Sequence, residues 1–253
     1  MAEPDGRALA RAVGPLGLWT AAFEGQPFDV ERKAVQALEA ARRTLADAHP
    51  GRFVMGVGAS HGPLVDVRGH RYERPFSRMC GLLGEMDGAP VQGAIADARA
   101  PLVLAALGPR MLGLAGERAD GALTYLVTPE HTAMARETLG SAPALCVEQG
   151  VVLTDDVEQA RRVGREGLEM YLGLPNYVQN WKRLGFDDDD VADGGSDRLV
   201  DAMVVSGDAE RIAQCVREHH DAGADHVCLQ VFPTDGALPE REWSELAELL
   251  QDR

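Results

Sequence analysis

The sequence predicts an α/β fold built on a parallel β-sheet. Two observations lead to this fold class: short runs that are apolar at nearly every position, and helical patterns that separate these runs. Strands covered on both faces, as in parallel sheets, have this nearly continuous apolar character. The chain has 253 residues, 45% hydrophobic and 26% charged, and a complete (β/α)8 barrel averages about 250 residues. We therefore expect a single domain over residues 1–253.

Six apolar runs are the candidate strands, and several of them end in Gly, Ser, Thr or Pro, which are typical of turns. Their alternation with helices predicts a parallel sheet with right-handed crossover connections. The runs are Leu16–Phe23, Phe53–Gly58, Pro101–Leu107, Gly121–Val127, Ala144–Leu153 and His226–Phe232.

Helices are expected between these strands. From Val30 to Ala48 the apolar residues recur at spacings of three and four, which is typical of one helix face. Residues 128–130, Thr-Pro-Glu, combine an N-cap, a proline at the first helical position and an acid in the first turn. Residues 154–156 and 207–208 predict two further helix starts.

A segment from about residue 171 to 206 interrupts the alternation and is expected to be a helical lid or subunit-contact insertion. It contains the acidic run Asp187–Asp190. A solvated turn before a helix is the simplest interpretation of this run. A calcium loop requires ligands that alternate with spacers and a downstream glutamate, and the run lacks that pattern.

Charge and composition exclude several classes of protein. With 40 acidic and 25 basic residues the net charge is −15, so nucleic acid and anionic membrane surfaces are expected to be repelled. The four cysteines show no C-x-x-C spacing, which favours buried reduced thiols over disulfides or zinc. Because residues 1–13 lack a signal-peptide core and no apolar run approaches about 18 residues, we expect a cytoplasmic protein.

The loop after the second strand is the first candidate site, because ligands of parallel α/β folds lie beyond the carboxyl ends of the strands. Its glycines, Gly56 and Gly58, allow a planar ligand to approach the backbone closely. His61 is a candidate proton donor or acceptor. Its spacing alone favours the alternative, a loop histidine without a role. Nearby arginines form either a cationic rim for an anionic group or ordinary surface pairs with Asp66 and Glu73; they are Arg68, Arg71 and Arg74.

The loop after the third strand is the second candidate site. Gly108 and Pro109 form a turn at a helix start, where free backbone N–H groups and the positive end of the helix dipole favour a phosphate, with Arg110 adding charge. A Gly-Pro dipeptide also serves any tight turn. The sequence lacks the Rossmann and P-loop signatures, the G-x-S-x-G elbow and the H-E-x-x-H zinc motif. Metal binding is not expected at His219 and His220, and His226 is interpreted as a turn residue.

Several motifs in order along the chain resemble the bacterial-luciferase-like oxidoreductases, a family of luciferase-like monooxygenases. Residues 50–58, PGRFVMGVG, resemble the family's P-G-R-F-x-x-G-x-G strand. Residues 104–111 and 114–121, LAALGPRM and LAGERADG, resemble its A-x-G-P-[KR] strand and L-A-G-x-x-A-D-G turn, and residues 222–227, AGADHV, its closing strand. With residues 17–20, GLWT, and 174–177, LPNY, the set is similar to an actinobacterial subgroup assigned to coenzyme F420. The resemblance runs from about Leu16 to Phe232.

This resemblance implies a TIM-type barrel that binds F420 or FMN and transfers a hydride between the cofactor and an organic substrate. Carried onto this chain, the ring-binding loop is Gly58, Ala59 and Ser60, followed by His61, which falls where some relatives have an acid/base residue. The phosphate-binding turn is Leu107–Arg110. The same resemblance implies a small-molecule substrate. The segment from residue 171 to 206 and the strands discussed next lead us to expect a homodimer.

The chain departs from the family between the first and second predicted strands. One helical stretch, Val30–Ala48, stands where the family places two further strands with their helices, so the second and third βα units are expected to be missing. The remaining six strands can close into a narrower barrel, stay open, or be completed by a dimer partner. Two alternatives to the enzyme remain: a non-catalytic relative that lost part of the ring-binding pocket, and an unrelated α/β protein that binds a small molecule.

Overall fold

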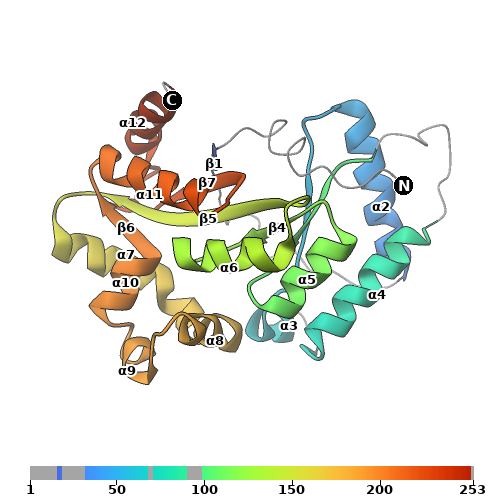
Figure 1. Cartoon of the computed structure of the whole chain (residues 1–253), viewed down its shortest axis with the longest axis horizontal. Coiled ribbons are helices and arrows are strands. Elements are labelled where there is room, and N and C mark those ends of the chain that lie inside the picture. The colour runs from blue at the N-terminus through green and yellow to red at the C-terminus, as the bar shows by residue number, and fades with distance from the viewer. Residues whose placement is uncertain (1–15, 19–31, 68–70, 90–98, 252–253) are drawn as a thin grey trace.

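The computed structural model describes residues 16–18, 32–67, 71–89 and 99–251. Over these ranges strands and helices alternate as the sequence predicts (Figure 1). The strands are β1 (Leu16–Leu18), β2 (Met55–Val57), β3 (Leu102–Ala105), β4 (Gly121–Thr124), β5 (Ala144–Leu153), β6 (Val204–Gly207) and β7 (His226–Val231). The six predicted strands are therefore confirmed in the described residues. The part of the first run from residue 19 to 23 lies outside them.

All strand pairs in the described part of the chain are parallel, in the order β1-β7-β5-β4-β3-β2. The sequence missed β6, which pairs with the last four residues of β5. Residues 146–147 of β5 pair with both β4 and β7, and residues 150–151 with both β6 and β7. β4 and β6 therefore pair with the same edge of β5, β4 near its start and β6 near its end. Among the described residues, β1 and β2 lie at the two ends of the sheet and do not pair with each other. Of the three arrangements expected from the sequence, this is the open sheet.

The helices are α2 (Arg32–Ala48), α3 (Gly62–Val67), α4 (Pro75–Asp87), α5 (Pro109–Arg118), α6 (Pro129–Leu139), α7 (Val157–Leu172), α8 (Pro175–Arg183), α9 (Asp188–Val191), α10 (Asp197–Met203), α11 (Ala209–Asp221) and α12 (Glu240–Gln251). The predicted helix starts are confirmed by their caps. Thr128, Asp156 and Asp208 each accept a hydrogen bond from a backbone N–H in the first turn of α6, α7 and α11. One helix, α2, stands between β1 and β2 in the described residues, as the proposed loss of two βα units requires.

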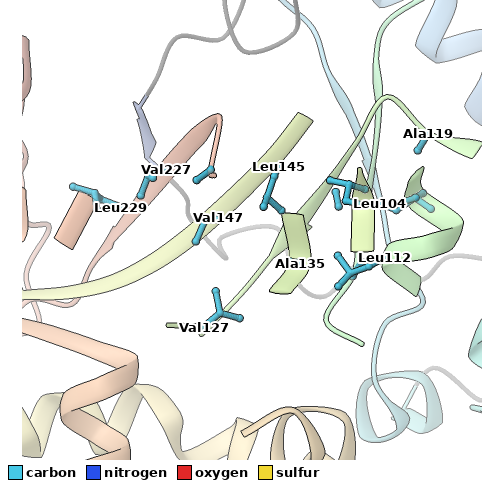
Figure 2. Close-up of a cluster of buried hydrophobic side chains, with 14 of the residues drawn as sticks. Leu104, Leu112, Ala119, Val127, Ala135, Leu145, Val147, Val227 and Leu229 are labelled. Atoms are coloured by element: carbon cyan, nitrogen blue, oxygen red, sulfur yellow. The ribbon is translucent and has the colours of Figure 1, made fainter. Parts of the chain in front are cut away.

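The main hydrophobic core lies between one face of the sheet and helices α4, α5, α6, α11 and α12. Figure 2 shows members of this core from β3, β5 and β7 and from α5 and α6. Register explains which strand residues take part: Leu104, Leu145 and Val147 point to the helices, whereas their neighbours Val103, Ala105, Cys146 and Glu148 point to the opposite, inward face.

A second core lies under the segment that the sequence identified as an insertion. Helices α8, α9 and α10 occupy this segment and gather with α7 at the lower left of Figure 1. Leu126, Leu168, Trp181, Leu199 and Met203 are fully buried there. Leu107 packs against both cores. The insertion is thereby anchored on the carboxyl ends of the strands.

The acidic run in this insertion forms the start of α9. Asp187 and Asp190 make a capping box, in which each side chain accepts a hydrogen bond from the other residue's backbone N–H. Asp190 also pairs with Arg198, which holds its pKa well below the ordinary range. The run is thus the cap and first turn of α9 rather than a solvated turn before a helix, because Asp188–Asp190 are helical and Asp190 is buried.

His219, His226 and the four cysteines lie in positions that give them structural roles. His219 is completely buried and bonds to Thr132 Oγ1 and Gln149 Oε1, both at 2.9 Å. His226 is the buried first residue of β7, rather than a turn residue. All four cysteines are free thiols. The described residues contain no group of His, Cys, Asp or Glu side chains placed to share a metal ion.

Candidate active site

The candidate site lies at the carboxyl ends of β2, β3 and β4, where α8 crosses from the insertion. Residues 57 and 104 pair in register, as do 105 and 123, so the loops that follow these strands emerge side by side. The two loops singled out by the sequence are therefore brought together.

The loop after β2 carries an unusual backbone and a buried imidazole. Ser60 has a φ of +59°, a left-handed conformation that non-glycine residues seldom adopt and that costs about 1–3 kcal/mol. His61 follows it, half-buried, with its ring centroid 5.6 Å from that of Tyr177 in α8. Burial lowers the pKa of His61, so the neutral imidazole is favoured. Its Nδ1 atom is buried and has no hydrogen-bond partner among the described residues.

Gly58 in the same loop has a packing role. A Cβ added there would lie 3.0 Å from the Ala105 Cβ, so the glycine favours the close approach of β2 to β3. Gly58 and Ala105 are both exposed on the inward face of the sheet, and a Cβ on Gly56 would meet nothing within 4 Å. Backbone is therefore accessible at this strand end.

The loop after β3 begins helix α5 in the way the sequence predicts. Gly108 is the extended N-cap and Pro109 the first helical residue. The Leu107 carbonyl lies 3.0 Å from His131 Nε2 of α6. The Arg110 side chain does not turn to Gly108: its guanidinium lies over the Phe76 ring of α4, 4.2 Å from the ring centroid. The guanidinium beside Gly108 belongs to Arg183, the last residue of α8, whose Nη2 would lie 3.5 Å from a Cβ on Gly108.

The end of β4 is held in a strained conformation by its neighbours. Leu126 has a φ of +52°, which is an outlier for a bulky side chain. Its N–H donates to Glu148 Oε2 at 3.0 Å, and its carbonyl accepts from Trp181 Nε1 at 3.2 Å. Burial raises the pKa of the Glu148 carboxyl to about 8, although the Leu126 bond opposes this. The pair of bonds ties β5, β4 and α8 together.

Three tyrosines form a cluster beside this point. The Tyr125 hydroxyl donates to Gln230 Oε1 at 2.7 Å, and the Tyr171 hydroxyl donates to that of Tyr125 at 3.1 Å. The Tyr177 ring packs edge-on against Tyr171, with centroids 4.8 Å apart. The cluster links β4, β7, α7 and α8 and continues to His61 through Tyr177.

A hollow of about 450 Å³ opens between α3 and the start of α8. Its lining is largely apolar, with Asp66 and Asn176 as the polar members; the others are Gly62, Pro63, Tyr72, Pro75, Leu174 and Pro175. These residues adjoin His61 and Tyr177 in the chain. The sequence left open whether the nearby arginines form a cationic rim or ordinary surface pairs. Arg71 forms a surface pair, with its Nη1 3.8 Å from Glu73 Oε1. Arg68 lies outside the described residues.

Sequence reasoning missed Arg183, Tyr125 and Glu148. Glu148 left a signal, since it is the one acid in the mostly apolar run 144–153. Arg183 and Tyr125 left none, because their positions depend on how the insertion folds over the strand ends.

Comparison with known proteins identifies the family. The family model described as luciferase-like monooxygenase matches residues 85–226, more than half of the chain. No curated protein matches the sequence. In the described helices, no segment has the length and apolar character needed to cross a membrane.

Solved structures with the same fold include three oxidoreductases. The chain is 18% identical to coenzyme F420-dependent tetrahydromethanopterin reductase from Methanopyrus kandleri, with a TM-score of 0.62 over 84% of this chain and 77% of that one. An F420-dependent secondary alcohol dehydrogenase, in complex with an F420-acetone adduct, is 16% identical, with a TM-score of 0.56 over 79% and 70%.

The third is the oxygenating constituent of 3,6-diketocamphane monooxygenase from Pseudomonas putida, in complex with FMN. It is 16% identical, with a TM-score of 0.56 over 95% of this chain and 88% of that one. These similarities show a common α/β fold of the TIM-barrel type. With the matching family model they establish that the chain belongs to the luciferase-like monooxygenase family.

Proposed function

We propose that the chain is an oxidoreductase that uses coenzyme F420 or FMN with an organic substrate. The observation that carries the proposal is His61, a half-buried imidazole that burial keeps neutral. Its buried Nδ1 has no hydrogen-bond partner among the residues that the structure describes, and it directly follows a left-handed serine at a strand end. A strained residue beside an unsatisfied titratable group is typical of a functional site. The family relationship supports the same class of chemistry.

The residues present fit a flavin-like group. The exposed backbone at Gly58, with Ala59 and Ser60, suits a flat ring, and the turn from Leu107 to Arg110 suits an anionic tail because α5 starts there. When bound, F420 or FMN would supply the hydride donor or acceptor. His61 would hold or accept the substrate proton at its imidazole nitrogen, and the hollow lined by Pro63 and Tyr72 would take the apolar part of the substrate.

The test is a titration of the purified protein with F420 and with FMN, followed by fluorescence at physiological salt. We expect micromolar binding of one cofactor. His61→Ala should leave this affinity within about threefold but lower turnover by about 100-fold or more, which is the usual contribution of acid/base catalysis. His49→Ala is the matched control, since His49 is an exposed histidine at the opposite end of the β2 unit.

The pH profile supplies an independent check. Because burial lowers the pKa of His61, turnover that requires neutral imidazole should stay constant at neutral pH and decline only below about pH 6.5. If the protein binds neither cofactor, the enzyme hypothesis is wrong and the alternative, a non-catalytic relative, is the one that fits. Full activity of the His61→Ala variant would remove His61 from the chemistry.

A further inference from the structure

Within the described residues, the His61 side chain lacks the Nδ1 hydrogen bond that usually orients a histidine in acid/base chemistry. Such a bond ordinarily joins one ring nitrogen to a carbonyl or carboxylate and leaves the other nitrogen for the reaction. The His61 Nδ1 atom is nevertheless buried. The imidazole is therefore enclosed by packing contacts, and these are what can fix its angle.

The aromatic neighbour of His61 is Tyr177, in the first turn of α8. The two ring centroids lie 5.6 Å apart, with the ring planes tilted by 53°, which is a distance typical of packed aromatic pairs. Tyr177 is 6% exposed, so its ring belongs to the core and is not a mobile surface group. The Tyr177 ring thus restricts the angles that are open to the imidazole.

Tyr177 is itself packed against further aromatic rings. Its centroid lies 4.8 Å from that of Tyr171, 6.0 Å from that of Trp181 and 6.2 Å from that of Tyr125. Trp181 is fully buried, and its Nε1 donates to the Leu126 carbonyl at the end of β4 at 3.2 Å. A column of packed rings therefore runs from the strand ends through α8 to the imidazole.

From this column we propose that Tyr177 is a positioning residue, which holds the His61 imidazole at the angle that its reaction requires. The proposal rests on the proposed function, because the angle matters only if His61 acts on a substrate. A displacement of about 1 Å at a reacting group can lower a rate by about 100-fold. Ring packing would do here what a hydrogen bond does in other acid/base sites. The insertion then sets the geometry of the reacting group, in addition to covering the strand ends.

The experiment compares Tyr177→Leu, which removes the ring but keeps an apolar side chain, with Tyr177→Phe, which keeps the ring. The histidines are isotope-labelled, and the His61 resonances are assigned by their loss in His61→Ala. Three-bond scalar couplings then report the χ1 angle of His61. We expect a single χ1 rotamer in wild type and in Tyr177→Phe, and a mixture of rotamers in Tyr177→Leu. If Tyr177→Leu does not fold, Tyr177→Met takes its place, since its flexible side chain fills irregular space.

Phe186→Leu is the matched control. Phe186 lies in the same insertion, is 7% exposed and packs against the Arg198 guanidinium, whose Cζ is 4.5 Å from the ring centroid. The variant loses a buried ring of similar size, so a general loosening of the insertion would appear in both leucine variants. Phe186→Leu should keep the single His61 rotamer.

Turnover of the cofactor-loaded enzyme gives a second readout. Tyr177→Leu should lower kcat by about tenfold or more and leave cofactor affinity within about threefold, because the ring positions the acid/base group and not the cofactor. Its pH profile should also move. Since burial lowers the pKa of His61, water admitted by the lost ring raises that pKa toward 6.5, and the acid-side decline of turnover begins at a higher pH than in wild type.

A mixture of His61 rotamers in wild type would overturn the proposal, as would a single rotamer retained in Tyr177→Leu. Equal averaging in Phe186→Leu or in Tyr177→Phe would overturn it as well, because neither variant removes a ring from His61. The couplings are measured without a ligand, so they separate this proposal from the proposed function. Averaging confined to Tyr177→Leu supports the orienting contact even if the protein binds neither F420 nor FMN, a result that would refute only the proposed function.

Discussion

At the scale of single residues, Glu148 is an acidic side chain that is completely buried in the sheet. It lies in β5, with one carboxyl oxygen bonded to the Leu126 N–H and the other without a partner in the described residues. A buried carboxylate is costly, so the group is expected to keep its proton. Glu148 then serves as the acceptor that stabilises the strained Leu126 turn beneath α8.

This state of Glu148 predicts a pH dependence of stability. Burial raises its pKa from 4.5 to about 8, so the folded protein keeps a proton that the unfolded chain releases near pH 4.5. The free energy of unfolding therefore has a contribution that is complete below pH 4.5, declines as pH rises toward 8 and is lost above it. The decline is on the order of a few kcal/mol.

Glu148→Gln should abolish this decline while keeping the Leu126 bond. Urea unfolding at pH 4 and pH 9 measures it: the variant should resemble wild type at pH 4 and be more stable than wild type at pH 9. Glu169→Gln, at an exposed position of α7, is the control. A Gln variant with the same pH dependence as wild type would show that Glu148 is already ionised in the folded protein.

At the scale of elements, the motif aspartates explain how the parallel strands are aligned. Asp120, just before β4, accepts a hydrogen bond from the Leu102 N–H at the start of β3, at 2.7 Å. Asp225, just before β7, accepts one from the Leu145 N–H at the start of β5, at 2.8 Å. Each aspartate thus satisfies an amide in the first two residues of the neighbouring strand. These A-D-G and G-A-D motifs act at the amino ends of the strands, away from the candidate site.

Helix packing gives a second prediction, from two glycines of α5. A Cβ on Gly116 would lie 2.8 Å from the Leu139 carbonyl oxygen of α6, whereas a Cβ on Gly113 would meet nothing within 4 Å. Gly116→Ala should destabilise the protein by about 1–3 kcal/mol, because backbone must move. Gly113→Ala should stabilise it by about 0.5–1 kcal/mol through helix propensity. Thermal unfolding of both variants tests this, and equal effects would contradict the α5–α6 contact.

At the scale of the whole molecule, the described sheet ends at β1 and β2 instead of closing on itself. Exposed strand edges present unpaired backbone groups and favour pairing with another chain. We therefore expect a homodimer, in line with the proposed loss of two βα units. Light scattering during gel filtration should give twice the chain mass of 27.2 kDa. A mass equal to one chain at micromolar concentration would contradict a dimer.

The sequence by itself determined the fold class, the positions of six strands and the two strand-end loops, because apolar periodicity and turn residues are local signals. β6 was missed, since it is a short strand whose partner is set by where the insertion ends. The placement of Arg183 over Gly108, the bonding of Trp181 to Leu126 and the Tyr125–Gln230 contact were decided only by tertiary structure. They join residues 55 to 105 positions apart, and the chain leaves no local pattern for contacts created when an insertion packs across the ends of a sheet.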